Sequence, residues 1–470
     1  MNAFIGAVSI SVFIYPTDYL SWHDACWYRC WHQRVDCFGR YFCAGSCRAI
    51  ILLYHVLGLI SDCPQTSKRG TYNAILVSTI IPFGPSVLYA QLIAYHSNWR
   101  YVGLFCGLWA CVGMVMTAIF YFPPSRINSS GLTKTDIISQ IDFVGGFLSV
   151  TGVLLFFAAL TWGGYQYPWS SPHVLVPLLL GIVIIIAFIF WEIYGAKYPM
   201  FPSRLKKDPR ILILTLLITF ISGAQLFSVA VFWPSQAYNV YGHDPIGVGL
   251  CGLPVAFSIL VGACIVLYLL SVFKGGNRAL LVISSCIMTA GSGAMACLNR
   301  DNLNIAYGIL VIAGLGIGGI VVPASIITTI ICPDDLIATV TALTLAIRVI
   351  GGAVGYAVYL NVFQHKFIGH LTEGIVTACI ENNIFNPSTI REIAELTVCS
   401  LTERIMDVPG VNGNVTIYNS LVIAGQEAYA QSYPWVYYAS IPFGVLSIIA
   451  SLFLGDINKY MDDHVAVVIN

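Results

Sequence analysis

The stretch Val174–Tyr194, VLVPLLLGIVIIIAFIFWEIY, is apolar along almost its whole length and carries one carboxylate, Glu192, near its end. At a rise of about 1.5 Å per residue, a helix of this length crosses a hydrocarbon core of about 30 Å. Apolar residues surround such a helix instead of forming one stripe, which is typical of a helix that contacts lipid or other membrane helices. The stretch therefore predicts a transmembrane helix.

Nine more stretches of this kind lie between Tyr72 and Leu454. We expect them at Tyr72–Tyr95, Tyr101–Phe122, Phe143–Trp162, Ile211–Trp233, Ile246–Val272, Ala279–Cys297, Ile305–Thr329, Ile337–Phe363 and Val436–Leu454. Composition agrees, since 57% of the residues are hydrophobic, 9% are charged and the mean hydropathy is +0.80. Soluble domains carry about a quarter charged residues. We therefore predict an all-α polytopic membrane protein, and its net charge of zero does not indicate nucleic-acid binding.

Lys and Arg alternate between the connectors of the predicted spans. The connectors on one side hold Lys68, Arg69, Arg126, Lys134, Lys197, Arg204, Lys206, Lys207, Arg210, Lys274, Arg278 and Lys459. The short loops on the other side hold only Arg100 and Arg300. By the positive-inside rule the first side is cytoplasmic, so the C-terminus lies inside and the long segment 365–433 lies outside or in a lumen.

The segment 365–433 is expected to be an extracytoplasmic loop with short helical patterns. It contains Asn414-Val415-Thr416, a glycosylation sequon on the side where glycosylation occurs. Its cysteines, Cys379 and Cys399, are candidates for a disulfide on an oxidising face. The alternatives are an unused sequon and two unpaired thiols. A second sequon at Asn128 falls on the cytoplasmic side and is expected to stay unmodified.

Residues 1–70 form an atypical segment rich in Cys, Trp and Arg. Five of the fifteen cysteines lie between Cys26 and Cys47. Their spacing has no matching second half, so no metal site is predicted, although zinc remains an alternative. The other interpretations are cysteines packed in a helix near the membrane and a stretch outside the intended reading frame. Residues 49–61 are apolar but too short to span, and Asn2–Tyr15 lacks the features of a signal peptide.

The sequence carries no catalytic constellation. Metalloprotease, serine-hydrolase and Walker A motifs are absent, so we predict no enzyme, no cofactor and no ATP-driven pump. Any transport must then be driven by a gradient. The glycines between Gly314 and Gly319 lie inside an apolar span, where close helix packing explains them better than a dinucleotide loop.

Polar side chains inside the spans are the candidates for a transport pathway, because an ionisable group in lipid normally faces the bundle interior. Arg348 lies near the middle of Ile337–Phe363. It either lines a substrate or proton pathway or forms a gating ion pair. The alternatives are a structural arginine bonded to backbone carbonyls and one that snorkels to the cytoplasmic edge. Gln91, Gln225 and Asn361 are weaker candidates, with interhelical hydrogen bonding as the alternative. Gly351, Gly352 and Gly355 are expected to let another helix approach closely.

Several short motifs follow one another along the chain. They are Gly84-Pro85, Asn98-Trp99-Arg100-Tyr101, Asp142-Phe143-Val144-Gly145-Gly146, Arg348 with Gly351-Gly352 and Gly355, and the tail Gly455-Asp456-Ile457-Asn458-Lys459. Their order resembles the fourteen-span drug:proton antiporters of the major facilitator superfamily. The external loop and the tail look like the fungal trichothecene efflux pump and siderophore transporter group, and Gly84-Pro85 resembles the antiporter motif.

The resemblance implies alternating access by rocking of two helical bundles, with proton coupling. It also exposes a departure, because the family's first three spans, most of its fourth and its loop motif between spans two and three have no counterpart here. The domains are then an atypical segment at 1–70, a remnant of the N-terminal bundle at 72–135 and a central helix pair at 142–195. The C-terminal bundle at 211–364, the loop at 365–433 and the last span with a cytoplasmic tail at 436–470 follow.

The expected function is proton-coupled efflux of an amphipathic small molecule, a toxin or a drug. The alternatives are a siderophore-iron transporter of the same family, a truncated and transport-inactive member or faulty gene model, and a membrane receptor or enzyme that uses the external loop. The expected partners are the lipid bilayer, a small-molecule substrate and protons, with no nucleic acid. The plasma membrane is the expected location, with a vacuolar or vesicular membrane as the alternative.

Overall fold

The computed structural model describes residues 69–98, 100–120, 142–164, 167–197, 199, 208–242, 244–273, 276–333, 336–411 and 413–461. These residues are mainly helical and contain no β-strand. They divide into two compact units, one running from residue 93 to 199 and the other comprising 69–92 and 208–461. Helix α4 (Ser86–His96) crosses the boundary. The partial span at 49–61 lies outside the described residues.

The first unit contains α5 (Arg100–Phe120) and a hairpin made of α7 (Phe143–Trp162) and α8 (Pro172–Phe190). Gly181 lets the hairpin close, since a Cβ there would lie 2.7 Å from the backbone nitrogen of Phe156. Asp142 caps α7 by accepting a hydrogen bond from the Gly145 backbone N–H (2.8 Å). Its carboxylate also accepts a hydrogen bond from Trp191 Nε1 (3.1 Å). Trp191 is the first residue of the π-helical turn Trp191–Gly195 that follows α8.

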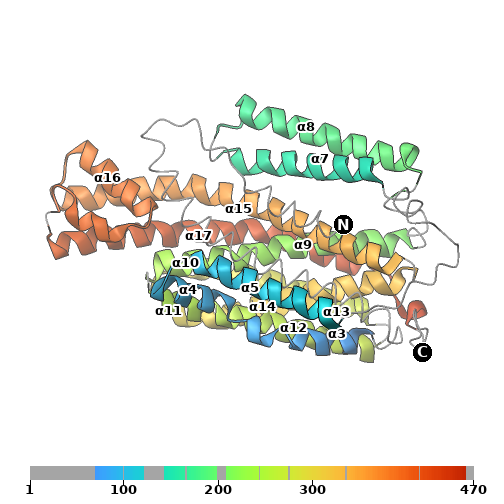
Figure 1. The fold of residues 1–470 in the computed structure, drawn as a ribbon. Helices are drawn as coiled ribbons and strands as arrows, with labels where there is room; N and C mark the ends of the chain where they lie inside the picture. The colour runs from blue at the N-terminus through green and yellow to red at the C-terminus, as the bar shows by residue number, and fades with distance from the viewer. Residues whose placement is uncertain are drawn as a thin grey trace. The chain divides into compact units, whose positions relative to one another are not determined.

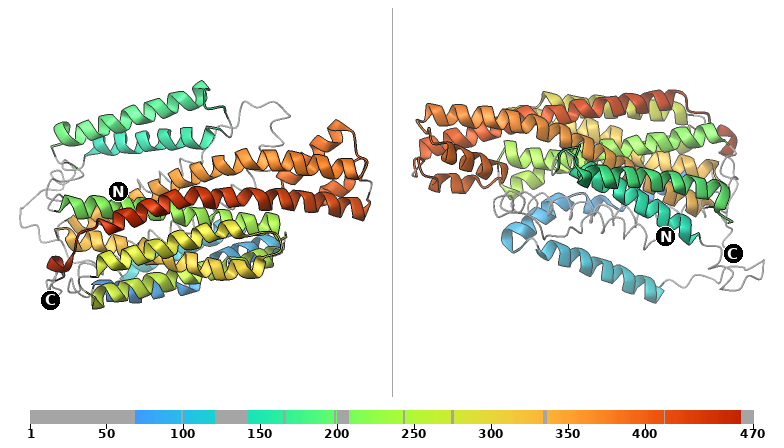
Figure 2. Two further views of the ribbon diagram at one scale, coloured as in Figure 1. Left: turned by 180° about the vertical axis from the view of Figure 1, so that it is seen from behind. Right: turned by 90° about the horizontal axis from the view of Figure 1, so that it is seen from above.

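The second unit is a helical bundle, drawn from several sides in Figures 1 and 2. Its helices are α3 (Arg69–Ser78), α9 (Pro209–Ala230), α10 (Phe232–Val240), α11 (Pro245–Cys251), α12 (Leu253–Val272), α13 (Asn277–Ala294), α14 (Leu303–Ile331), α15 (Ile337–Glu381), α16 (Pro387–Val398) and α17 (Val415–Leu452). Helix α14 packs against α12 and α13, and α15 packs against α9 and α17. Across both units, eight helical segments among the described residues are long and apolar enough to cross a membrane.

These eight segments match the third to tenth predicted spans, and α5 matches the second. The first predicted span, Tyr72–Tyr95, is not one continuous helix. It is divided into α3 and α4 by a short 3₁₀ turn, Ile81–Phe83. Pro82 and Pro85 explain the break, because proline has no N–H to donate and disfavours a helical conformation in the residue before it.

The segment 365–433 is helical over most of its length, where the sequence indicates a loop with short helices. Helix α15 continues to Glu381, and α17 begins at Val415. At about 1.5 Å per residue, the 45 residues of α15 extend over about 67 Å, well beyond the thickness of a bilayer. Both long helices project past the rest of the bundle, with α16 at their far end (Figure 1). We call residues 364–433 the extension.

An amphipathic stripe explains why the extension is helical. Phe367, Leu371 and Ile375 recur every four residues along α15 and are buried. Aromatic rings continue this core, since the ring centroids of Phe367 and Tyr429 lie 4.2 Å apart. The mixed charges on the outer face obscure this stripe in the sequence.

The residues after α17 fold back onto the ends of other helices. The Arg210 guanidinium donates to the Phe453 carbonyl (3.0 Å), and the Asn277 amide donates to the Gly455 carbonyl (3.0 Å). The Tyr460 hydroxyl also bonds the Asp208 carboxylate. The tail therefore joins the C-terminal end of α17 to the N-terminal ends of α9 and α13.

Candidate functional site

Helices α9 and α15 approach each other closely along a seam of small residues. A Cβ on Gly223 would overlap the Arg348 carbonyl, and one on Gly351 would overlap the Phe220 carbonyl. Farther along, a Cβ on Gly355 would lie 2.7 Å from Ala224 Cβ, and one on Gly352 would lie 2.6 Å from the Phe227 ring. The seam exists because these positions carry no side chain.

Arg348 lies at one end of this seam and joins α15 to α14. Its side chain is buried, with 3% of its surface exposed. The guanidinium donates through Nη2 to the Val321 carbonyl and to Ser325 Oγ (3.0 Å). Hydrogen bonds to a carbonyl and a hydroxyl offset part of the cost of placing a charge in an apolar interior.

Gln225 and Tyr359 bring polar atoms to the place where α9, α15 and α17 meet. The Gln225 amide donates to the Ser440 carbonyl of α17 (2.6 Å), and the Tyr359 ring packs against Phe443 of α17 at 5.9 Å between centroids. Both side chains are fully buried. Within the described part of the chain, Gln225 Oε1 and the Tyr359 hydroxyl have no hydrogen-bond partner.

An unsatisfied buried polar group costs about 1–3 kcal/mol. Gln225 Oε1 and the Tyr359 hydroxyl are therefore candidate positions for contact with a polar group of a ligand. Aromatic rings pack around Tyr359, since Phe232 lies 6.2 Å from Tyr359 and 5.8 Å from Tyr356 between ring centroids. We call Gln225, Tyr359, Phe232, Tyr356 and Phe443 the junction site. It contains a buried acceptor, Gln225 Oε1, and a buried hydroxyl, that of Tyr359, with aromatic rings packed around Tyr359.

A second polar row, whose residues were not predicted from the sequence, links α10 to α17. The Tyr437 hydroxyl donates to Gln236 Oε1 (2.7 Å), and the Ser235 and Tyr433 hydroxyls lie 2.9 Å apart. A signal was available, because Tyr433 and Tyr437 lie four residues apart on one helix face. These groups satisfy one another and so serve to hold the two helices together.

Arg69 has a different position from the one that the sequence suggests. The sequence places it in a connector, whereas the structure begins α3 with it and buries it almost completely. Its Nη1 donates to the Thr329 carbonyl (3.1 Å), within the last turn of α14. Carbonyls in a last turn lack a partner within the helix, so Arg69 supplies one.

The remaining predicted pathway residues lie outside the junction site. Asn361 donates to the Ala357 carbonyl of its own helix (2.9 Å). Gln91 is half-buried on α4, and among the described residues no hydrogen bond links it to Gln225 or Arg348. Gly84 and Pro85 lie at the break before α4, where a Cβ on Gly84 would lie 3.3 Å from the Phe257 ring of α12.

The predicted modification residues lie in the extension. Asn414 is exposed and caps α17, because its Oδ1 accepts from the Thr416 backbone N–H (3.0 Å). Cys379 and Cys399 are buried near the ends of α15 and α16. Among the described residues, no group of His, Cys, Asp and Glu is arranged to hold a metal ion.

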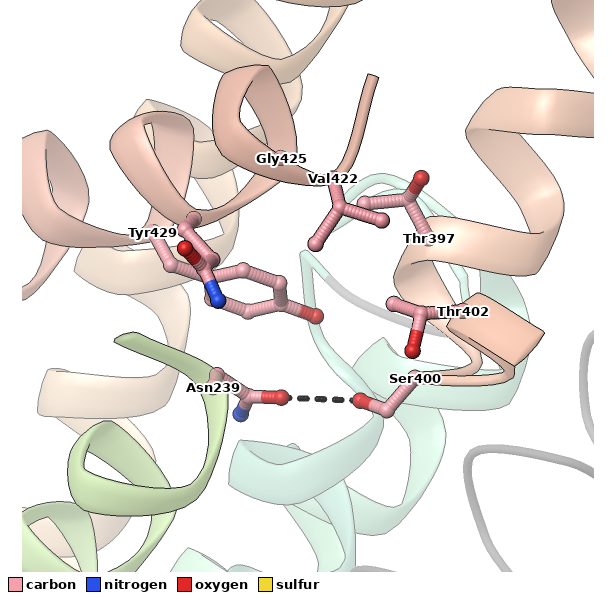
Figure 3. A pocket seen from close by; sticks show the side chains of 8 residues that line it. Asn239, Thr397, Ser400, Thr402, Val422, Gly425 and Tyr429 are labelled. Atoms are coloured by element: carbon pink, nitrogen blue, oxygen red, sulfur yellow. Dashed lines mark hydrogen bonds between the residues drawn. The ribbon is translucent and has the colours of Figure 1, made fainter. Parts of the chain in front are cut away.

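A small pocket lies in the extension, where α16 and α17 meet the end of α10 (Figure 3). Asn239 and Ser400 form a hydrogen bond across its floor (2.8 Å). Its space of about 220 Å³ includes open solvent. Ligand sites usually enclose about 300–1,000 Å³. The pocket is therefore too small to receive a molecule of metabolite size.

Known proteins resemble this chain over most of its length. The family model described as "Fungal trichothecene efflux pump (TRI12)" matches residues 55–470. The trichothecene efflux pump of Fusarium sporotrichioides is 25% identical over 85% of this chain and 68% of its own length. An MFS-type transporter of Fusarium mangiferae is 29% identical over 62% of this chain and 51% of its own length. A rubrofusarin-specific efflux pump of Gibberella zeae is 27% identical over 68% of this chain and 59% of its own length.

Among solved structures, a bacterial homolog of the human lysosomal transporter Spinster covers 96% of this chain at 17% identity, with a TM-score of 0.39. The chain covers between half and about two thirds of the length of the three sequence relatives named above. The matched family comprises membrane transporters and not enzymes. Since its model covers nearly the whole chain, this multi-pass membrane protein belongs to the fungal trichothecene efflux pump family.

Proposed function

We propose that the protein is a proton-coupled secondary transporter that exports an amphipathic small molecule from the cytoplasm. The observation that carries this proposal is the junction site, where Gln225 Oε1 and the Tyr359 hydroxyl are buried without hydrogen-bond partners among the described residues and aromatic rings pack around Tyr359. Such a site fits a mostly apolar molecule with a few oxygen atoms. The relatives named above are efflux pumps and an MFS-type transporter, which supports export.

In this proposal the junction site supplies a hydrogen-bond donor and an acceptor to the transported molecule. The Tyr359 hydroxyl can donate to a ligand carbonyl or ether oxygen, while Gln225 Oε1 accepts from a ligand hydroxyl. A molecule that lacks these groups would leave both protein atoms unpaired, so it would bind less well. Selection would therefore depend on a few polar groups carried by a rigid apolar body.

Arg348 is proposed to couple helix movement to transport without carrying the proton itself. A guanidinium stays protonated under physiological conditions, so it acts as a fixed charge. Its hydrogen bonds to Val321 and Ser325 hold α15 against α14 in this state. Alternating access requires helices to shift, and Arg348 would exchange these acceptors for others as α15 moves.

The plasma membrane is the proposed location, with the tail after α17 on the cytoplasmic face. Efflux across this membrane would lower the cytoplasmic concentration of the substrate. A pump in a vacuolar or vesicular membrane would instead store it. Fluorescence microscopy of the full chain with a C-terminal fluorescent tag separates the two locations.

The experiment is a flux assay in vesicles that contain the full chain, with an imposed pH gradient and a radiolabelled trichothecene as the probe. We expect gradient-dependent accumulation, and Tyr359→Phe should raise the KM severalfold without reducing the amount of inserted protein. Tyr438→Phe is the matched control, because Tyr438 is half exposed on α17 and lies outside the site. Arg348→Ala should abolish accumulation while insertion is unchanged.

Three results would contradict parts of the proposal. Accumulation that does not depend on the pH gradient would reject proton coupling. Unchanged kinetics in Tyr359→Phe would remove the junction site from the pathway. Uptake of a ferric hydroxamate in the direction opposite to export, with no trichothecene flux, would favour the siderophore alternative.

A further inference from the structure

Asn414 combines a sequence motif with a geometry that leaves its amide nitrogen available. It begins the motif Asn414-Val415-Thr416 and is exposed, as is Thr416. Its Oδ1 accepts from the Thr416 backbone N–H at 3.0 Å, which fixes the side chain at the N-terminal end of α17. This bond uses the oxygen of the amide, so Nδ2 stays directed away from the cap.

The helix that follows Asn414 is long enough to hold this residue well clear of a bilayer. Helix α17 has 38 residues and a length of about 57 Å, and the hydrocarbon core occupies about 30 Å of it. About 27 Å of helix then separates Asn414 from the core. An enzyme at the membrane surface could therefore reach the residue.

Basic residues at the opposite end of α17 indicate which side of the membrane Asn414 occupies. Arg210 bonds the Phe453 carbonyl just beyond α17, and Asn277, next to Arg278, bonds the Gly455 carbonyl. Lys and Arg near the ends of spans favour the cytoplasmic side. The C-terminal end of α17 is then cytoplasmic, and its N-terminal end with Asn414 is extracytoplasmic.

We propose that Asn414 is an N-glycosylation site at the far end of the extension. The substrate is a lipid-linked oligosaccharide pyrophosphate. The Asn414 Nδ2 atom forms a bond to the anomeric carbon of the sugar, and the bond from that carbon to the pyrophosphate breaks. The amide nitrogen loses one proton, and the lipid pyrophosphate is the leaving group. This proposal is independent of the transported molecule.

The extension contains a second asparagine in nearly the same setting, which provides a matched control. Asn386 is exposed and caps α16, and its Oδ1 accepts from the Ser388 backbone N–H at 3.1 Å. The residue between them is Pro387, and proline at this position removes the motif. The two sites share a cap geometry and differ in whether the motif is complete.

The experiment is expression of the full chain in a fungal host, followed by treatment of membranes with an endoglycosidase that removes N-linked glycans. The wild-type band should move to lower apparent mass. Thr416→Ala should abolish this shift while Asn414 keeps its cap, and Thr416→Ser should retain it. Asn414→Asp should also abolish the shift, since aspartate caps a helix as well as asparagine does.

Pro387→Val completes a motif at Asn386 and should produce a second, additional shift. Valine is the natural choice because Val415 holds the matching position in the Asn414 motif. Asn128→Gln should leave the shift unchanged. A wild-type band that does not move after treatment would overturn the proposal, and so would a shift that persists in Thr416→Ala.

Discussion

Helices α8 and α14 are both long and apolar, yet they differ in how much of them is buried. Helix α8 is the most apolar membrane-length helix among the described residues, but only 11% of its most apolar window is buried within the structure. The corresponding share for α14 is 56%. Hydropathy therefore identifies which segments enter a membrane, but it does not identify how much of each helix packs against other helices of its own unit.

Small residues account for the difference. A Cβ on Gly316 of α14 would overlap the Met288 backbone of α13, and one on Gly318 would overlap the Ile259 carbonyl of α12. Helix α8 has one such position, Gly181, which faces α7, and its other faces carry large exposed side chains such as Leu179 and Ile186. Lipid solvates leucine as well as a protein interior does, so helix association in membranes depends on close packing.

Gly351→Ala should have the largest effect, because it places a methyl group against a neighbouring backbone. The new Cβ would overlap the Phe220 carbonyl, so α9 and α15 would have to separate. Overpacking of a core typically costs about 1–3 kcal/mol, and the upper part of that range is expected where backbone opposes backbone. The measurement is the melting temperature of detergent-solubilised protein. An unchanged melting temperature would show that the seam is not tight.

Asp142→Ala should have an intermediate effect that is confined to the α7–α8 hairpin. The substitution removes the cap on α7 and the hydrogen bond from Trp191, with an expected cost of about 1–2 kcal/mol. Protease sensitivity of the hairpin, measured in membranes, is the readout. Asn at position 142 keeps a capping oxygen, so Asp142→Asn should recover most of the protection. Equal sensitivity of the two variants would exclude the cap as the cause.

Gly146→Ala and Gly308→Ala should have the smallest effects and serve as controls for Gly351→Ala. Neither position has a heavy atom within 4 Å of the new methyl group beyond its immediate neighbours. Alanine stabilises a helix by up to about 1 kcal/mol relative to glycine. We therefore expect melting temperatures equal to the wild type or slightly higher. A clear fall in the melting temperature of either variant would contradict the inference that glycines affect stability here through close helix packing.

Much of the fold followed from hydropathy, and the exceptions have local causes. The eight membrane-length helices coincide with predicted spans because twenty apolar residues in lipid leave the backbone no alternative to a helix. The division of the first span depends on Pro82 and Pro85, which interrupt the backbone hydrogen bonds without lowering hydropathy. The sequence predicts a loop for the extension because surface charges obscure the stripe formed by Phe367, Leu371 and Ile375.

The candidate site was predictable only in part. Arg348 and Gln225 stand out in the sequence because they are polar residues within apolar spans. Tyr359 does not, since tyrosine is common in membrane helices, and only the structure shows that its hydroxyl is buried without a partner among the described residues. The burial of Arg69 could not be predicted from the sequence either, because its partner is a backbone carbonyl 260 positions away in the chain.

The sequence by itself determined that this protein is an α-helical membrane protein that resembles a transporter family, and its orientation by charge stays a prediction. These properties depend on composition and on the order of short motifs, which do not require knowledge of contacts. The tertiary structure decided which helices meet and which polar groups face one another, namely the α9–α15 seam, the junction site and the extension. Contacts of this kind join residues far apart in the chain. They depend on glycines that let two helices pack closely, and hydropathy does not show which glycines do so.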